Sequence, residues 1–177
     1  MPHAWDTSVA SRTHGAGRHA GLLTAHLLAR RPIAFPTPTV QEVVHGIHAH
    51  IRIEEGFHAP ADWFAELLEH SLVRVIPFDE PSGVLAGRLL ALLPYPPTGR
   101  RRRPGTRSRQ RAAWALDVQI AACAFAGGYG VLTENVDDFA VLGGTISELF
   151  PDVPPLVVTD AQATTQPTAT MDDPGED

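Results

Sequence analysis

Short apolar segments alternate with longer amphipathic segments along most of the 177-residue chain, and this alternation restricts the folds that it can adopt. The short segments have the length and composition of buried strands: AWDTSV, IAF, LVRVIPF, VLT and PPLVV. The longer segments repeat apolar residues at three- and four-residue steps, as amphipathic helices do. Consecutive strands joined by helical crossovers run parallel to one another. We therefore predict an α/β fold with a short, mostly parallel central sheet.

The helix limits are indicated by local signals. We predict helices over residues 19–31 and from TPTVQEVV onward, where Thr39 and Glu42 have the spacing of a capping box. Asp79 is a plausible N-cap of a further helix. Residues 111–128 form a helix that ends at glycines. The segment VDDFAVLG after the VLT strand is predicted to be a turn or a short helix.

Two stretches differ in composition from the rest of the chain. Residues 94–111 are rich in Pro, Gly and Arg, and they hold half of the 14 cationic residues, all of which are arginine. They are predicted to form an exposed loop. Residues 159–177 have low hydrophobicity and no periodicity, and their acidic side chains account for most of the net charge of −6. We predict one folded domain over residues 1–158, followed by a disordered acidic tail over residues 159–177.

Several classes of protein are disfavoured by motifs that the sequence lacks. It contains no phosphate-binding G-x-x-x-x-G-K-[ST] or G-x-G-x-x-G and no nucleophile motif G-x-S-x-G. The single cysteine, Cys123, stands among alanines and is predicted to be a small buried hydrophobe. Residues 1–12 lack the apolar core of a secretory signal, and no apolar run reaches the roughly 20 residues that span a bilayer. We expect a soluble, cytoplasmic protein without a membrane partner.

Acidic residues stand where predicted strands end and helices begin. Asp6 ends the first strand, Glu42 lies in the first turns of the next long helix, and Asp117 lies near the start of the last long helix. Asp137 and Asp138 follow the VLT strand. In a parallel sheet these positions share one edge, where the carboxylates would repel one another unless a cation joined them. Oxygen ligands favour Mg²⁺ or Mn²⁺, and no His or Cys has the spacing of a zinc site.

Each acid also has a structural explanation. Asp and Glu are common near helix N-termini because they cap the helix and complement its dipole. Asp6 could be a turn residue, and Asp137 and Asp138 a solvated turn. The metal hypothesis therefore depends on the complete set and its order.

The same segments resemble a known family. AWDTSV, PTVQEVVHG, LDVQIAACAFAGGYGVLTENVDDF and PPLVV are similar, in this order, to PIN domains, and specifically to the VapC-type toxins of bacterial toxin–antitoxin pairs. The segment from Asp117 to Phe139 is the most specific part. The resemblance implies a three-layer α/β/α sandwich, Mg²⁺- or Mn²⁺-dependent endoribonuclease activity, a cognate antitoxin that covers the active-site groove, and a homodimer.

The resemblance also assigns residues. Asp6, Glu42, Asp117 and Asp138 match the acidic positions of the family, with Asp6 and Asp117 as metal ligands. Asn135 occupies a functional place in T-x-N-x-x-D-F and is interpreted as a polar helper, whereas Asp137 faces solvent.

Three hydroxyl side chains are placed to hydrogen-bond the metal-ligating carboxylates: Thr7, Ser8 and Thr133. Alternatively, they are turn and strand hydroxyls satisfied by the backbone.

The arginines before Asp117 could attract the RNA backbone toward the acidic pocket. The residues concerned are Arg100, Arg101, Arg102, Arg103, Arg107 and Arg109. The alternatives are a solvated loop or a contact with an acidic antitoxin segment.

The sequence thus predicts a metal-dependent ribonuclease toxin with RNA as its substrate. The alternatives are a PIN nuclease that acts in RNA processing and an inactive PIN-like scaffold that binds a partner.

Overall fold

The predicted strands form one parallel sheet in the computed structural model, which describes residues 1–53, 58–97 and 107–165. The strands are β1 (His3–Trp5), β2 (Ile33–Pro36), β3 (Val73–Ile76), β4 (Gly130–Thr133) and β5 (Val158–Asp160). Their order in the sheet is β3-β2-β1-β4-β5, and every neighbouring pair is parallel. The α/β prediction is confirmed. Because β1 lies between β2 and β4, the residue that follows β1 is near the centre of the sheet edge.

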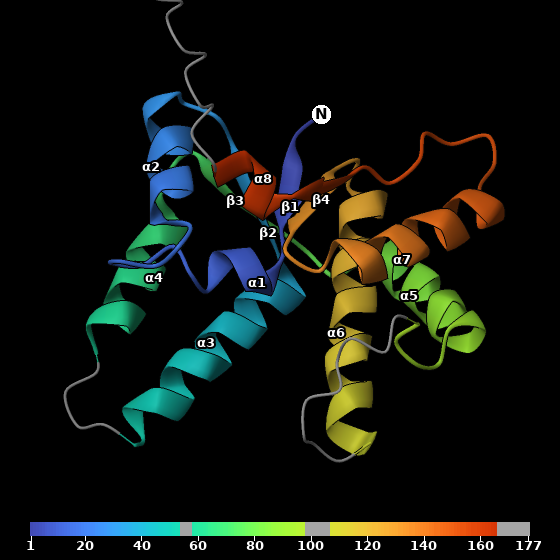
Figure 1. The fold of residues 1–177 in the computed structure, drawn as a ribbon, viewed down its shortest axis with the longest axis horizontal. Coiled ribbons are helices and arrows are strands. Elements are labelled where there is room, and N and C mark those ends of the chain that lie inside the picture. The colour runs from blue at the N-terminus through green and yellow to red at the C-terminus, as the bar shows by residue number, and fades with distance from the viewer. Residues whose placement is uncertain (54–57, 98–106, 166–177) are drawn as a thin grey trace, which may run out of the picture.

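Helices cover both faces of the sheet (Figure 1). The helices are α1 (Thr7–Ala10), α2 (Ala20–Leu28), α3 (Thr37–Ile51), α4 (Ala59–Glu69), α5 (Glu80–Leu92), α6 (Arg107–Ala126), α7 (Val136–Leu149) and α8 (Ala161–Thr165). In Figure 1, α1 to α4 lie on one side of the strands and α5 to α7 on the other. The chain therefore has the predicted three layers.

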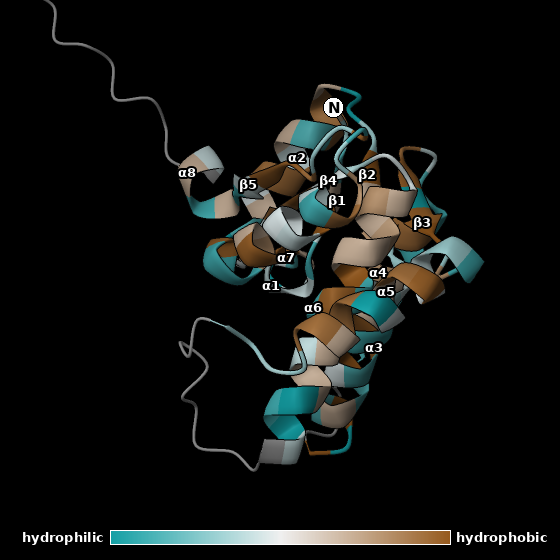
Figure 2. Ribbon diagram, turned by 90° about the vertical axis from the view of Figure 1, so that its right-hand side faces the viewer, coloured by the Kyte–Doolittle hydropathy of each residue, from teal (hydrophilic) through white to brown (hydrophobic). Residues whose placement is uncertain are grey.

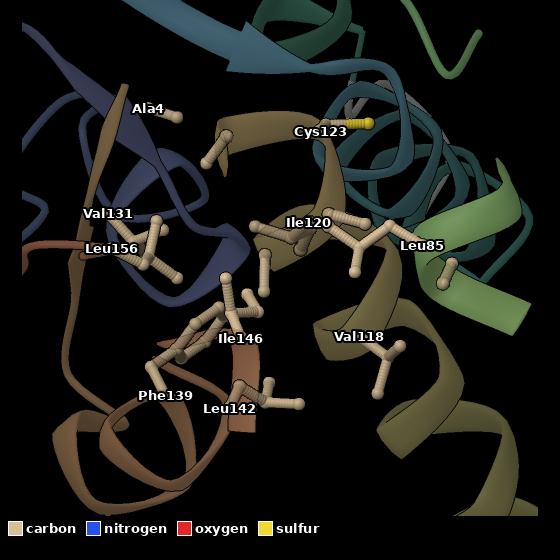
Figure 3. Close-up of a cluster of buried hydrophobic side chains, with 14 of the residues drawn as sticks. Ala4, Leu85, Val118, Ile120, Cys123, Val131, Phe139, Leu142, Ile146 and Leu156 are labelled. Carbon is tan, nitrogen blue, oxygen red and sulfur yellow. The ribbon is translucent and has the colours of Figure 1, made fainter. Parts of the chain in front are cut away.

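Side chains of the central strands alternate between two hydrophobic clusters. Ala4 and Val131 belong to the cluster formed with α5, α6 and α7, whose interior is shown in Figure 3. Their chain neighbours Trp5 and Leu132 belong to the cluster formed with α1 to α4. Successive strand residues point to opposite faces, so strands covered on both sides bury every position, as β2 and β4 do. In Figure 2 hydrophobic residues concentrate around the strands, and the ends of α3 and α6 that extend away from the sheet carry hydrophilic residues.

Two helices are longer than predicted. α6 begins at Arg107, not at residue 111, so the end of the predicted loop 94–111 is helical and Asp117 lies in the middle of α6. Arginine is a good helix former, which explains the earlier start. The segment predicted as a turn or short helix is the 14-residue helix α7, because Phe139, Leu142 and Ile146 form a buried stripe along it.

The predicted tail starts too early. Thr159 and Asp160 complete β5 and are followed by α8, in which Ala161 is fully buried. The described part of the chain therefore continues seven residues beyond the predicted domain end at Val158. Residues 166–177, for which disorder was predicted, lie outside the described residues.

The predicted capping box at Thr39 is also wrong. The N-cap of α3 is Pro36, and the Thr39 hydroxyl instead donates a hydrogen bond to the Trp5 carbonyl oxygen (3.1 Å). Asp79, by contrast, is the N-cap of α5 and accepts a hydrogen bond from the Ser82 backbone N–H.

Cys123 is fully buried in the cluster of Figure 3, as predicted. Burial raises the pKa of its thiol to about 11. The thiolate form is therefore scarce at neutral pH, as is typical of a buried structural cysteine.

Candidate active site

The carboxylate of Asp6 is held by three donors at the carboxyl end of β1. Its Oδ1 accepts a hydrogen bond from the Thr7 backbone N–H (2.7 Å), and its Oδ2 accepts from the hydroxyls of Ser8 and Thr133 (2.8 Å each). Asp6 is the N-cap of α1, and only 4% of its surface is exposed. Thr133 ends β4, which pairs with β1, so two strands distant in sequence fix one carboxylate.

Asp117 and Asp138 are joined by the side-chain amide of Asn135. Asn135 Nδ2 lies 3.2 Å from Oδ2 of Asp117 and 3.0 Å from Oδ2 of Asp138. Asp117 is 4% exposed and Asp138 is fully buried. The two carboxylates come from α6 and from the first turn of α7. Because Oδ2 of each carboxylate contacts the same nitrogen atom, the two carboxylates lie close together.

The Thr133 hydroxyl connects the two groups of acids. It donates to Asp6 and accepts a hydrogen bond from the Asn135 backbone N–H (2.9 Å). A continuous chain of hydrogen bonds therefore runs from Asp6 through Thr133 and Asn135 to Asp117 and Asp138. The structure brings these three predicted acids to the same edge of the sheet.

Glu42, the fourth predicted acid, lies on α3. The Thr39 hydroxyl, one helical turn earlier, binds the Trp5 carbonyl and ties the start of α3 to the end of β1. Glu42 is partly exposed and lines a cavity of about 440 Å³ together with Thr7. Glu42 therefore shares this cavity with Thr7, the chain neighbour of Asp6.

Other predicted residues lie away from the buried acids. Asp137 is exposed on α7. Arg109 is exposed in the first turn of α6, and its backbone is about 12 Å along the helix from Asp117, at 1.5 Å per residue. Arg107 is the first residue of α6. The remaining predicted RNA-binding arginines, Arg100 to Arg103, lie outside the described residues.

The oxygen atoms of the buried acids are the type of ligand that a hard divalent cation prefers. Asp6, Asp117 and Asp138 offer oxygen atoms at a buried sheet edge, and Mg²⁺ is often held by one or two carboxylates with water completing its shell. Within residues 1–53, 58–97 and 107–165, no group of three or more His, Cys, Asp or Glu side chains is arranged so that it could hold a metal ion. Of these three carboxylates, Asp117 and Asp138 are joined through the Asn135 amide.

A second charged cluster was not predicted from the sequence. Glu134, which follows β4, pairs with the guanidinium groups of Arg12 and Arg18, the latter at 3.2 Å. Its Oε1 also lies 2.7 Å from Nε2 of the fully buried His19. The Glu134 backbone N–H donates to the Ser8 hydroxyl (3.0 Å), and Ser8 donates to Asp6. The cluster therefore adjoins the candidate site. A signal was present in the two arginines and the histidine after DTSV, but only the fold identifies their partner.

The cluster changes the acidity of Glu134. Partial burial by itself raises the pKa of Glu134, but hydrogen bonds from Arg12 and His19 and the charges of Arg12 and Arg18 outweigh it. The pKa is therefore lowered from its ordinary value of 4.5. A carboxylate whose pKa is depressed by folding stabilises the folded state above the unfolded pKa, and this stabilisation is lost as pH falls through the folded pKa.

Replacing Glu134 by Gln is expected to lower the free energy of unfolding by about 1–2 kcal/mol at neutral pH. The charge-assisted hydrogen bonds are lost, and the exposure of both arginines to solvent limits the effect. The difference from the wild type should shrink as the pH falls below the ordinary value of 4.5, because the unfolded chain then binds a proton at Glu134, and it should disappear as the pH falls through the lower pKa of the folded protein. Urea unfolding of both proteins at a series of pH values measures this difference.

Glu148→Gln is the matched control for Glu134→Gln. Glu148 is exposed on α7, and its replacement should change the free energy of unfolding by less than about 0.5 kcal/mol. A Glu134→Gln effect that stays constant down to pH 3 would contradict the ion-pair explanation.

The chain resembles known proteins in structure but not in sequence. No known protein family matches the chain, and no curated protein matches it. The structure is similar to that of VapBC2 from Rickettsia felis bound to a DNA fragment from their promoter, with a TM-score of 0.57 and 16% identity over 90% of this chain and 98% of the other. It is also similar to DNA-bound VapBC from Salmonella typhimurium, with a TM-score of 0.54 and 15% identity over 90% and 98% of the two chains.

FitAcB from Neisseria gonorrhoeae is a further structural relative. The TM-score is 0.50 and the identity 22%, over 78% of this chain and 91% of the other. At such identities the likeness shows the fold, which is PIN-like. Among the described helices, none combines the length and the apolar character that a membrane span requires.

Proposed function

We propose that this chain is a divalent-metal-dependent endoribonuclease that acts as the toxin of a toxin–antitoxin pair. The observation that carries the proposal is the hydrogen-bonded set of three buried carboxylates at the carboxyl edge of the sheet, Asp6, Asp117 and Asp138. Carboxylates gathered at one sheet edge repel one another, and a bound cation would offset this repulsion, which supports a functional role. The PIN-like fold and the VapBC structures among the relatives agree with the resemblance of the sequence to VapC-type toxins.

In the proposed site the carboxylates hold Mg²⁺ or Mn²⁺. Asp6 and Asp117 are the metal ligands, and Asp138 and Glu42 are the further acidic residues of the site. When bound, the ion supplies an acidified water and a positive charge beside the scissile phosphate.

Neighbouring residues of the chain orient these carboxylates. Ser8, Thr133 and the Thr7 N–H fix the rotamer of Asp6, so that its carboxylate is aligned before any ligand arrives. The Asn135 amide sets the spacing of Asp117 and Asp138. No side chain is required to attack phosphorus, in agreement with the raised thiol pKa of Cys123.

The proposal includes RNA as the substrate and an antitoxin as the partner. Both VapBC relatives are DNA-bound structures, and in the toxin reading the antitoxin would supply such DNA contact. The arginines Arg12 and Arg18 provide positive charge close to the acids and complement an RNA backbone. The homodimer stays a prediction.

Purified protein free of antitoxin is expected to cleave a mixed RNA in Mg²⁺ or Mn²⁺ and to be inactive in EDTA. Removal of the ion removes the activated water and leaves the carboxylates to repel the phosphate. Gel analysis of end-labelled RNA measures cleavage, and excess Mn²⁺ added after EDTA should restore it. Cleavage that persists in EDTA would contradict the metal-dependent mechanism. Growth arrest on expression, relieved by the product of a neighbouring gene, separates a toxin from an RNA-processing enzyme.

A further inference from the structure

A cavity of about 440 Å³ opens beside the candidate active site, between α1, α3 and α4. Its lining includes Glu42 and Thr7, the chain neighbour of Asp6, and also Ile47 and Trp63. This volume falls in the range of small-molecule pockets and greatly exceeds that needed for a water molecule. The buried acids and their hydrogen bonds do not account for it.

One wall of the cavity is aromatic. The Trp63 ring lies against the His14 ring, with centroids 4.9 Å apart and planes inclined at 59°, and both residues line the cavity. Trp63 is partly exposed, whereas Trp5 and Trp114 are fully buried. Of the three tryptophans, Trp63 therefore has a surface that a ligand can cover.

The cavity also has a polar side. Thr7 Oγ1 is buried without a hydrogen-bond partner in the described part of the chain, although its residue lines the cavity. A buried hydroxyl without a partner is costly and is readily explained when a ligand satisfies it. The nearby carboxylate of Glu42 disfavours a phosphate group in the same place. This lining would suit a flat aromatic group that carries hydrogen-bonding groups and no negative charge.

We propose that this cavity binds one nucleobase of the RNA, stacked on Trp63 and hydrogen-bonded to Thr7 Oγ1. The proposal rests on the function proposed above. Proteins that recognise single-stranded RNA commonly stack unpaired bases on aromatic side chains. A base held here would contact Thr7, the chain neighbour of Asp6, and would bring its adjoining phosphodiester toward the acids. Trp63 and Thr7 are therefore positioning residues that hold the strand in register.

Gly46 allows the cavity to be blocked without removal of a core side chain. It lies on α3 in the cavity wall, and a Cβ added there meets nothing within 4 Å. Gly46→Leu therefore fills the cavity, and it also removes a glycine from a helix interior, which favours folding. Gly87 on α5 is exposed and equally unobstructed, so Gly87→Leu is the matched control.

The test uses the full chain carrying Asp117→Asn, so that the RNA stays intact, and follows tryptophan fluorescence. A short single-stranded RNA is expected to quench Trp63, and an abasic strand of the same length and charge is not. Gly46→Leu and Trp63→Ala should each weaken RNA binding by about 5- to 150-fold, the range of one stacked base, as measured by filter binding. Gly87→Leu should bind as the parent does. In the otherwise wild-type chain, Gly46→Leu should raise KM more than it lowers kcat.

The outcomes separate this proposal from the nuclease proposal. Quenching by RNA but not by the abasic strand supports the base site, even if no cleavage is found. The base site is overturned if RNA and the abasic strand bind equally well, or if Gly46→Leu leaves RNA binding unchanged. If metal-dependent cleavage is found in either case, the nuclease proposal still holds. Quenching by a peptide of the antitoxin, with none by RNA, also overturns it and assigns the cavity to a protein side chain.

Discussion

Replacing Asp117 by Asn is expected to reduce RNA cleavage more than about 100-fold while the protein remains folded. The loss should exceed the 10- to 100-fold effect typical of residues that only support a metal ligand, because Asp117 is proposed to contact the ion itself. Asn has nearly the same shape as Asp, so the buried site keeps its packing. Removal of one of three mutually repelling carboxylates should leave the free energy of unfolding within about 1 kcal/mol of the wild type, or raise it. Single-turnover cleavage in Mn²⁺, together with urea unfolding, measures both quantities.

Asp137→Asn is the matched control for this experiment. Asp137 is exposed, although it is the chain neighbour of Asp138 at the start of α7. Its replacement removes the same charge and should leave cleavage within about twofold of the wild type. If Asp117→Asn cleaves RNA at the wild-type rate, the proposed active site is wrong. Equal losses in both variants would indicate a general electrostatic effect in place of metal ligation.

Replacing Trp114 by Ala is expected to lower the free energy of unfolding by about 3–5 kcal/mol. Trp114 lies on α6 and is fully buried in the cluster formed with α5 and α7. Its Nε1–H donates a hydrogen bond to the carbonyl oxygen of Leu93, just beyond the end of α5 (2.7 Å). The substitution therefore leaves a large cavity and a carbonyl without its donor. Because domains are commonly stable by only about 5–15 kcal/mol, this is a large fraction of the total, and urea unfolding detects it directly.

Trp114→Phe separates packing from hydrogen bonding. Phe keeps most of the ring volume and loses the N–H, so its cost should be clearly smaller than that of Trp114→Ala, at about 1–3 kcal/mol. Costs below about 1 kcal/mol for Trp114→Ala would mean that α5 and α6 are not held together by this side chain. Because α6 also carries Asp117, destabilisation at Trp114 should reduce activity only under conditions in which the protein is partly unfolded.

The sequence by itself determined the type and order of most elements. Apolar runs and helical periodicity are local properties, and they predicted four of the strands and the parallel sheet, whereas only Val158 of the segment PPLVV belongs to β5. They were less reliable at element ends. α6 starts before the predicted position, α7 is a full helix, and β5 with α8 extends past Val158, because tertiary burial of Phe139 and Ala161 outweighs weak local signals.

The order of the acids along the chain was visible in the sequence, but their mutual contacts were not. Thr133 reaches Asp6 across 127 residues of sequence because β4 pairs with β1. Asn135 joins Asp117 to Asp138 only after α6 and α7 pack against the same face of the sheet.

The partners of Glu134 and the cavity beside Trp63 were decided entirely by the tertiary structure. Arg12, Arg18 and His19 come from the segment that follows α1, whereas Glu134 comes from the end of β4. Likewise, His14 and Trp63 meet because α4 packs near α1. Periodicity encodes which face of an element is buried, but the choice of neighbouring element depends on the free energy of packing segments that are far apart in the chain. Local sequence therefore specified the strands, helices and acids of this protein, and the strand order β3-β2-β1-β4-β5 decided which of their side chains meet.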